Sequence, residues 1–176
     1  EFYFAETKAK EISILNELQL LIPEALQSYS WKKSMKWSNY DLNWGRPLRS
    51  ILSIFNKKHL KIKYSHLDSV DFTLIENDTE IKKKKVRNFQ EYFKFLKQND
   101  IILDQNERIK VISEKIKLIS KSRSCVELID QPLLLEVSNL VDKPRIIIAK
   151  FDKNYLKLPK EIIKSTLQSH QRYFTL

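Results

Sequence analysis

Residues 47–64 read PLRSILSIFNKKHLKIKY. A dense aliphatic and aromatic run precedes the polar residues Asn56 to Lys58, which are typical of a tight turn. After them, Leu60, Ile62 and Tyr64 alternate with polar residues, and a period of two indicates a strand with one buried face. We therefore expect two strands within this stretch.

Other segments carry weaker strand signals. Glu1 to Ala9 alternate aromatic and polar residues, and Phe72 and Leu74 precede a polar turn expected at Glu76 to Asp78. Residues 145–151 form an apolar, β-branched run that predicts a buried strand. Tyr173 to Leu176 are expected to open a further strand.

Helical spacing of apolar residues dominates the second half of the chain. Residues about 11–28, 89–96 and 105–121 each place apolar side chains on one stripe, which predicts amphipathic helices. Asp130 is a typical N-cap with a proline in the first turn of its helix. Pro159 is expected to start a last helix that runs to about residue 170.

Strands and helices are mixed without strict alternation, which predicts an α+β fold with a mixed sheet and packed helices. We take residues 1–176 as one region, with possible sub-lobes at 1–87 (strand-rich) and 88–176 (helix-rich). The residues expected to be buried are Trp37, Leu52, Ile54, Phe93, Ile112, Val137, Ile147 and Phe174.

The composition indicates a basic globular chain. Its formal net charge is +10, and such a surplus attracts polyanions, either nucleic acid or an anionic membrane. No apolar run reaches the roughly 20 residues of a membrane span, and no signal peptide is apparent. With a single cysteine, Cys125, the chain cannot form an internal disulfide. We therefore expect a cytoplasmic protein with no membrane partner.

Few catalytic signatures fit this sequence. With one glycine in 176 residues, a Gly-rich phosphate loop is excluded, and we attribute the scarcity to codon bias in an AT-rich genome. The histidines His59, His66 and His170 are scattered, whereas metal sites need converging ligands. We predict no catalytic, cofactor-binding or metal-binding residue in this chain.

Two basic segments are candidates for RNA contact. Lys82, Lys83, Lys84 and Lys85 with Arg87 place five positive charges in six positions, which suits phosphate contact, although a solvated loop is an alternative.

The second segment mixes aromatic and basic side chains. Lys36, Arg46 and Arg49 are interleaved with Trp37 and Trp44, a mixture suited to stacking on single-stranded RNA, although the tryptophans can instead be core anchors.

Four segments in order resemble the beta subunit of bacterial glycine–tRNA ligase. Met35-Lys36-Trp37 followed by Arg46-Pro47 resembles the family's "M-[RK]-W…R-P", and residues 101–108, IILDQNER, resemble its hydrophobic turn and "ER". Residues 134–144 resemble "LLEEV…LVEWP", and residues 151–174 resemble "F…FL.LP.E…QKYFP". Arg172 in this last segment completes our set of candidate tRNA contacts.

The sequence also departs from the family pattern at three places. Ser38 stands where the family usually has glycine, Thr175 replaces a proline, and Val70 to Asp78 replace the expected "RGHRF". The loss of that cluster weakens any expectation of a local RNA contact or a relic editing function.

The resemblance implies an internal fragment from the N-terminal half of a longer beta subunit. In this family the alpha subunit carries the class II catalytic core with ATP and glycine, and the beta subunit binds tRNA(Gly) within an α2β2 assembly. The implied fold is like the B3/B4 domain of the phenylalanine enzyme's beta chain. The fragment itself is expected to hold no cofactor and to be non-catalytic within an aminoacyl-tRNA synthetase.

Two other functions are kept as alternatives. One is a stand-alone basic nucleic-acid-binding domain, which the charge alone would explain. The other is an editing-like hydrolytic module, which would need a pocket lined by polar residues.

Overall fold

The computed structural model describes residue 3 and residues 12–76, 80–126 and 129–176. By their internal contacts these form two compact units, Glu1–Tyr92 (unit 1) and Phe93–Leu176 (unit 2). Helices and strands are both present, as expected for an α+β fold. The strand expected at 1–9 lies outside the described residues, apart from Tyr3, and so does the turn at 77–78.

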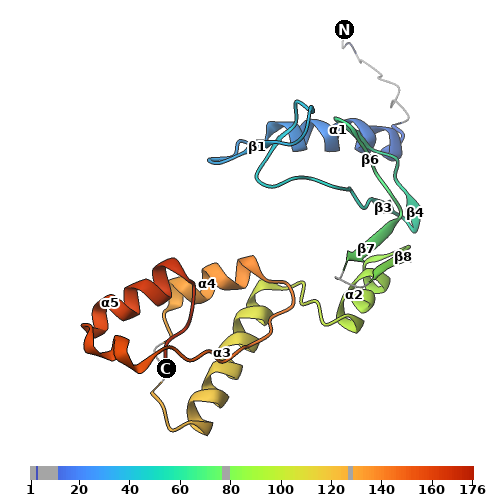
Figure 1. The fold of residues 1–176 in the computed structure, drawn as a ribbon. Helices are drawn as coiled ribbons and strands as arrows, with labels where there is room; N and C mark the ends of the chain where they lie inside the picture. The colour runs from blue at the N-terminus through green and yellow to red at the C-terminus, as the bar shows by residue number, and fades with distance from the viewer. Residues whose placement is uncertain (1–2, 4–11, 77–79, 127–128) are drawn as a thin grey trace. The chain divides into compact units, whose positions relative to one another are not determined.

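Unit 1 contains one long helix, α1 (Ile14–Ser28), and a series of short strands that pair in sequence order (Figure 1). The antiparallel pairs are β1 (Met35–Lys36) with β2 (Asn43–Trp44), β3 (Ile54–Phe55) with β4 (Lys58–His59), β5 (Lys63–Tyr64) with β6 (Leu67–Asp68), and β7 (Phe72–Glu76) with β8 (Ile81–Lys85).

The prediction of a mixed sheet is wrong for the described residues. Four separate two-stranded antiparallel sheets take its place, and a single parallel bridge joins Leu52 to Val70. Each pair consists of strands that are neighbours in the sequence, because a short turn brings them together at a low cost in loop entropy.

The β3–β4 hairpin confirms the turn expected near Asn56. Ile54 pairs with His59 and Phe55 with Lys58, so the loop has two residues. Both loop residues have positive φ, 46° at Asn56 and 63° at Lys57, which is the signature of a type I′ turn. Glycine is the preferred second residue of such turns, and here a lysine occupies that position.

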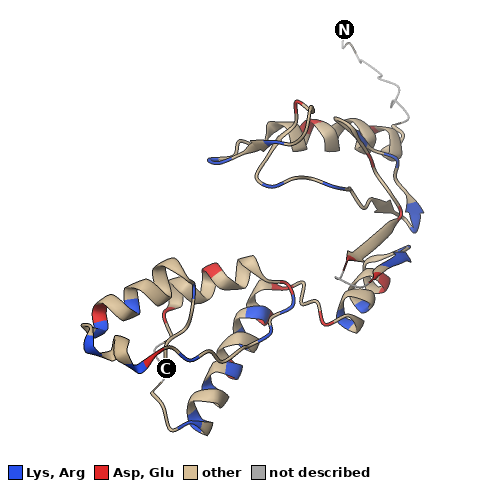
Figure 2. Cartoon of the chain, in the orientation of Figure 1, with Lys and Arg blue, Asp and Glu red and all other residues tan. Residues whose placement is uncertain are grey.

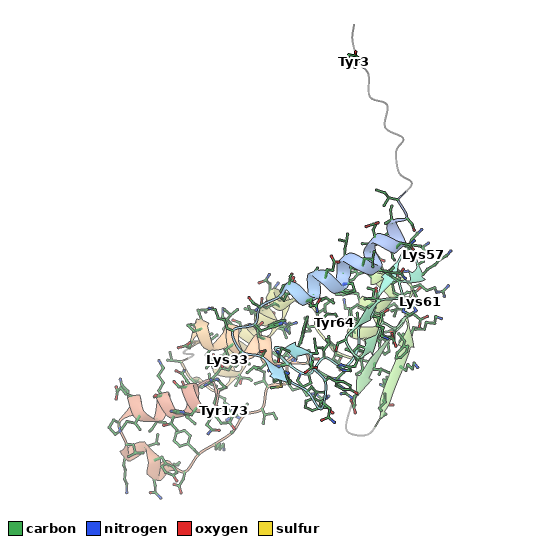
Figure 3. The ribbon with its side chains drawn as sticks, turned by 90° about the horizontal axis from the view of Figure 1, so that it is seen from above. Tyr3, Lys33, Lys57, Lys61, Tyr64 and Tyr173 are labelled. Atoms are coloured by element: carbon green, nitrogen blue, oxygen red, sulfur yellow. The ribbon has the colours of Figure 1, made fainter. Side chains whose placement is uncertain are left out.

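The alternating residues 60–64 form the core of unit 1, as expected. Leu60, Ile62 and Tyr64 are all buried, and α1 packs against β5, the strand that carries Tyr64 (Figure 3). The buried Ser69 hydroxyl donates to the Leu60 carbonyl at 2.8 Å and accepts from the Ile62 N–H at 2.8 Å. Ser69 therefore supplies hydrogen-bond partners for two backbone groups between β4 and β5 that are not paired with a neighbouring strand.

Helices make up most of unit 2, which takes in the C-terminal part of α2. These are α2 (Phe89–Gln98), α3 (Gln105–Ser122), α4 (Gln131–Leu140), a 3-10 turn η1 (Lys153–Lys157), α5 (Lys160–Ser165) and a π-helical turn η2 (Thr166–His170). The four helices expected in this half are confirmed, although the last ends in a π turn.

Side-chain caps explain where two helices of unit 2 begin. The Asp104 carboxylate accepts from the Glu107 N–H at 2.8 Å at the start of α3, and Asp130 accepts from the Leu133 N–H at 2.9 Å at the start of α4. Each cap satisfies a backbone donor that has no partner inside its helix. The cap predicted at Asp130 is thus confirmed.

The core of unit 2 lies between α3 and α4. Ile112, Ile116 and Leu134 are each at most 4% exposed. The partly buried residues that pack against them are Ile109, Ile129, Val137, Ile146 and Phe174. Burial is therefore confirmed for Ile112 and holds in part for Val137 and Phe174.

Arg108 connects the start of α3 to the end of α4. Its guanidinium donates to the carbonyls of Ile102 at 2.7 Å, Leu103 at 2.8 Å and Ser138 at 2.8 Å. A planar group with several fixed donors suits this task better than a lysine ammonium. The segment before α3 and the last turn of α4 are held together by one side chain.

Several expected core residues are exposed. Trp37 is 54% exposed, Phe93 is 37% and Ile147 is 87%, whereas Leu52 and Ile54 are half-buried. Residues 145–151 and 173–176 form no strand. Both segments have strand-like composition, but a strand also needs a partner ladder, and none of the described residues supplies one.

We expect Lys57→Gly to raise the free energy of unfolding by about 0.5–1 kcal/mol. Relief of a left-handed Cβ contact gains about 1–2 kcal/mol, and the added freedom of the unfolded chain offsets about 0.5–1 kcal/mol of it. Urea unfolding of the chain measures the change. Lys57→Ala is the matched control, because it removes the same charge and keeps Cβ; equal stabilisation by both changes would contradict the prediction.

We expect Arg108→Met to lower the free energy of unfolding by about 1–3 kcal/mol, because three carbonyls lose their donor, two of them in partly buried hydrogen bonds. Methionine keeps most of the aliphatic volume. Lys110→Met, at an exposed position of the same helix, is expected to change little. Similar losses for the two variants in thermal melts would show that the guanidinium is not the connection inferred here.

Candidate nucleic-acid interface

The candidate contacts near β1 and β2 are on the surface of unit 1. Lys36 lies in β1, and its Nζ is 3.0 Å from a carboxylate oxygen of Asp41. Arg49 donates to Glu76 Oε2 at 2.8 Å. Arg46 lies two residues after the end of β2 and is exposed. Two of these three cations therefore already have a carboxylate partner.

The lysine run 82–85 forms strand β8 and not a loop, although Lys83, Lys84 and Lys85 are exposed to solvent, as that alternative expected (Figure 2). Lys83 pairs with Leu74 and Lys85 with Phe72, which places these side chains on one face of the hairpin. Lys82 and Lys84, which pair with Ile75 and Thr73, lie on the other face. A period of two thus divides the run between two faces.

Acidic and aromatic side chains accompany this basic strand. Lys82 lies 3.0 Å from Glu80, and Lys85 lies 2.7 Å from Asp71. The Lys83 ammonium is 3.7 Å from the centroid of the Phe72 ring, a cation–π contact. Lys84 has no acidic partner among the residues that the structure describes.

The two remaining candidates are also paired. Arg87 Nε lies 3.9 Å from Glu91 Oε1, one helical turn further along the chain. Arg172 belongs to unit 2, where its Nε donates to Glu136 Oε1 at 2.7 Å. Arg172 thereby connects the segment after η2 to α4, which gives it a structural role beside any contact with RNA.

Charge compensation is the common feature of these candidates. Six of the nine have a carboxylate within 4 Å, and Lys83 lies over a ring, which leaves Arg46 and Lys84 among the described residues. Exposed ion pairs contribute only about 0–1 kcal/mol, so a phosphate can exchange for the carboxylate at low cost. The surface is therefore compatible with phosphate contact but is not a bare positive strip.

Asp71 is the acid most affected by this arrangement. The hydrogen bond from Lys85 lowers the pKa of the Asp71 carboxyl below its usual 3.8, helped by the charges of Lys85 and His59 and opposed by partial desolvation. A folded pKa below the unfolded one stabilises the fold above the unfolded pKa. That stability is lost as the pH falls through the folded pKa.

The aromatic residues of unit 1 divide into packed and exposed rings. Trp44 lies 4.9 Å from Trp31 and 6.1 Å from the buried Tyr64 between ring centroids, so it is a structural anchor. Gly45 permits this packing, because a Cβ there would lie 3.0 Å from Cε3 of Trp31. Trp37 is 54% exposed, so it is not the core anchor that the alternative interpretation expected.

Unit 2 has a half-open groove of about 430 Å³ that the sequence did not reveal. It is lined by the cations Lys97, Lys115, Lys143 and Arg145 and by two acids, Asp100 and Glu107. Lys143 lies 3.1 Å from Asp100, and Lys115 donates to the Pro144 carbonyl. The four cations are dispersed over residues 97–145, so no run of basic residues marks the groove in the sequence.

Other kinds of site find little support in the part of the chain that is described. There, no group of three or more histidine, cysteine or acidic side chains is placed to hold a metal ion. None of the helices in the same residues combines the length and hydrophobicity needed to span a bilayer.

Comparison with known proteins identifies the family. A family model described as "Glycyl-tRNA synthetase beta subunit" matches residues 1–176. This chain belongs to that family. The glycine–tRNA ligase beta subunit of Rickettsia canadensis is 35% identical over 175 residues, which is 99% of this chain and 26% of the relative. Those of Rickettsia akari and Rickettsia bellii are 34% and 35% identical over similar shares.

The chain spans about a quarter of the length of these curated relatives. Family membership confirms the resemblance that rested on four segments, at residues 35–47, 101–108, 134–144 and 151–174. Ser38, where the family usually has glycine, has a φ of 55°, in the left-handed region that favours glycine. Arg108 of the "ER" pair is the side chain that connects α3 to α4.

We expect Lys85→Met to raise the pKa of Asp71 towards its usual value, because the main cause of the lowered pKa is the Lys85 hydrogen bond. Lys84→Met, on the other face of β8, is the matched control and is expected to leave that pKa unchanged. Titration of the Asp71 carboxyl carbon by NMR measures both. An equal shift in the two variants would contradict the pairing.

Proposed function

We propose that this chain is a segment of a glycine–tRNA ligase beta subunit and that it supports glycyl-tRNA formation through tRNA(Gly) binding and subunit assembly. The observation that carries the proposal is the family match over residues 1–176, together with 35% identity to a beta subunit over 99% of the chain. The net charge of +10 supports a polyanionic partner.

The proposal places adenylate chemistry elsewhere. ATP and glycine would bind an alpha subunit, and the two kinds of subunit would form an α2β2 enzyme in the cytoplasm. A fold related to the B3/B4 domain of the phenylalanine enzyme is part of the same proposal. The contribution of this segment would be contact with tRNA and with neighbouring polypeptide.

The alternatives have less support. The family match favours a segment of a ligase subunit over a stand-alone nucleic-acid-binding domain. An editing-like hydrolytic module would need a polar reaction centre. In the groove of unit 2, the Asp100 carboxylate lies beside the Lys143 ammonium, an arrangement that serves structure as well as chemistry.

A chimaera tests the role in aminoacylation. We expect a complete R. canadensis beta subunit, with this chain in place of its matching region, to support glycylation of tRNA when mixed with an alpha subunit. The isolated chain is expected to show no glycine-dependent ATP–pyrophosphate exchange. Exchange by the pure chain, or a folded chimaera that assembles but fails in glycylation, would contradict the proposal.

A second experiment addresses tRNA contact. We expect the chain to bind tRNA weakly, with an affinity that falls steeply as salt rises, because phosphate contacts release counterions. Replacing Lys82 to Lys85 by glutamine is expected to weaken binding and to flatten the salt dependence by about 0.7–0.9 in logarithmic slope per lost contact. Titration of tRNA at two or more salt concentrations measures both effects.

The control removes the same number of charges from another surface. Lys150, Lys153, Lys157 and Lys160 are exposed and lie around η1 and α5. If their replacement by glutamine weakens binding as much as the β8 variant does, the effect belongs to net charge and not to β8.

A further inference from the structure

Residues 145–151, RIIIAKF, have the composition of a strand without its pairing. They form no strand, and they make no backbone–backbone hydrogen bond to any other described residue. Ile147 is 87% exposed and Ile148 45%, although three consecutive β-branched residues strongly favour a sheet. The segment therefore leaves both its backbone edges and much of its apolar surface uncovered.

The backbone of this segment is anchored at its N-terminal end, and a capped turn follows its C-terminal end. Before it, the Ile102 N–H donates to the Asp142 carbonyl at 2.8 Å, and Lys115 donates to the Pro144 carbonyl at 3.2 Å. After it, Asp152 caps η1 by accepting from the Asn154 N–H at 2.8 Å. An anchored end lowers the entropy that a partner strand must remove on pairing.

One side chain attaches the segment to the core of unit 2. Ile146 packs against the core of Ile112, Ile116 and Leu134, whereas its neighbours Ile147 and Ile148 are exposed. An exposed segment rich in β-branched residues and with bare backbone edges is a hazard for aggregation unless another chain segment pairs with it.

We propose that residues 145–151 are a docking strand that pairs with a β-strand from the part of the glycine–tRNA ligase beta subunit outside these 176 residues. About three quarters of the length of the relatives lies outside the matched region, which provides ample polypeptide for this partner. Pairing by backbone hydrogen bonds is the general mode of strand addition. Of the proposed function, the inference requires only that this chain is a segment of a longer beta subunit. It therefore stands or fails independently of tRNA binding and of the alpha subunit.

Hydrogen exchange distinguishes the possible occupants. In the isolated chain, the amides of residues 146–151 are expected to exchange rapidly. In the complete R. canadensis subunit, the matching amides are expected to exchange at least about 100-fold more slowly. Fast exchange in the complete subunit would overturn the proposal. So would protection of the isolated chain that rises with its concentration, because a second copy would then be the occupant.

Proline substitutions test the backbone bonds directly. Proline has no N–H and is not tolerated within a paired strand. Consecutive N–H groups of a strand point to opposite edges, so Ile147→Pro and Ile148→Pro together examine both edges. Ile147→Ala and Ile148→Ala are the controls, because they shorten the side chain and keep the N–H.

In the chimaeric complete subunit, at least one proline variant is expected to lose the slow exchange of residues 146–151 while its alanine control keeps it. In the isolated chain, the melting temperatures of each proline and alanine pair are expected to agree, since no backbone bond is present to lose. If both proline variants keep full protection in the chimaera, the segment is not a paired strand and the proposal fails.

Discussion

The hydrogen bonds of one arginine organise unit 2. Arg108 reaches the carbonyls of Ile102 and Leu103, just before α3, and that of Ser138, which lies 30 residues after Arg108 in the sequence. Once those segments are joined, α3 and α4 are aligned so that Ile112 and Leu134 meet in the core. The groove also depends on this connection, because Ile102 and Leu103 are part of its wall. Arg108, the arginine of the NER segment, therefore has a structural role in this chain.

Local ion pairs partly neutralise the surplus of lysine on the surface. The net charge of +10 is a property of the whole chain, yet most candidate cations in unit 1 lie beside a carboxylate. Exposed pairs of this kind are weak and exchangeable, so they moderate an attraction to phosphate without abolishing it. Such a pair also lowers the pKa of its acid, as the Lys85 hydrogen bond does for Asp71. Among the candidate cations, Arg46 and Lys84 are the two with neither a carboxylate nor an aromatic ring as partner in the described residues.

Scarcity of glycine adds strain at the turns. Within the described residues, seven non-glycine residues have positive φ, among them Ser38, Lys57 and Arg172. Such positions cost roughly 1 kcal/mol or more when a Cβ is present. The single glycine stands where Trp31 packs over the backbone, a place at which even a methyl group would be crowded. Turn strain and short strand pairs together limit the stability of unit 1 when it is considered by itself.

The sequence by itself determined the elements whose signals are local. Periodicity marked the four helices of residues 89–170 and the buried alternation of Leu60, Ile62 and Tyr64, and the cap at Asp130 followed from neighbouring residues. Four short segments, at residues 35–47, 101–108, 134–144 and 151–174, indicated the family. Only the tertiary structure decided which cations are neutralised, because Arg49 and Arg172 find their acids 27 and 36 residues away. It also showed Ile147 exposed, since composition records the tendency of a strand to form but not whether a partner ladder lies beside it.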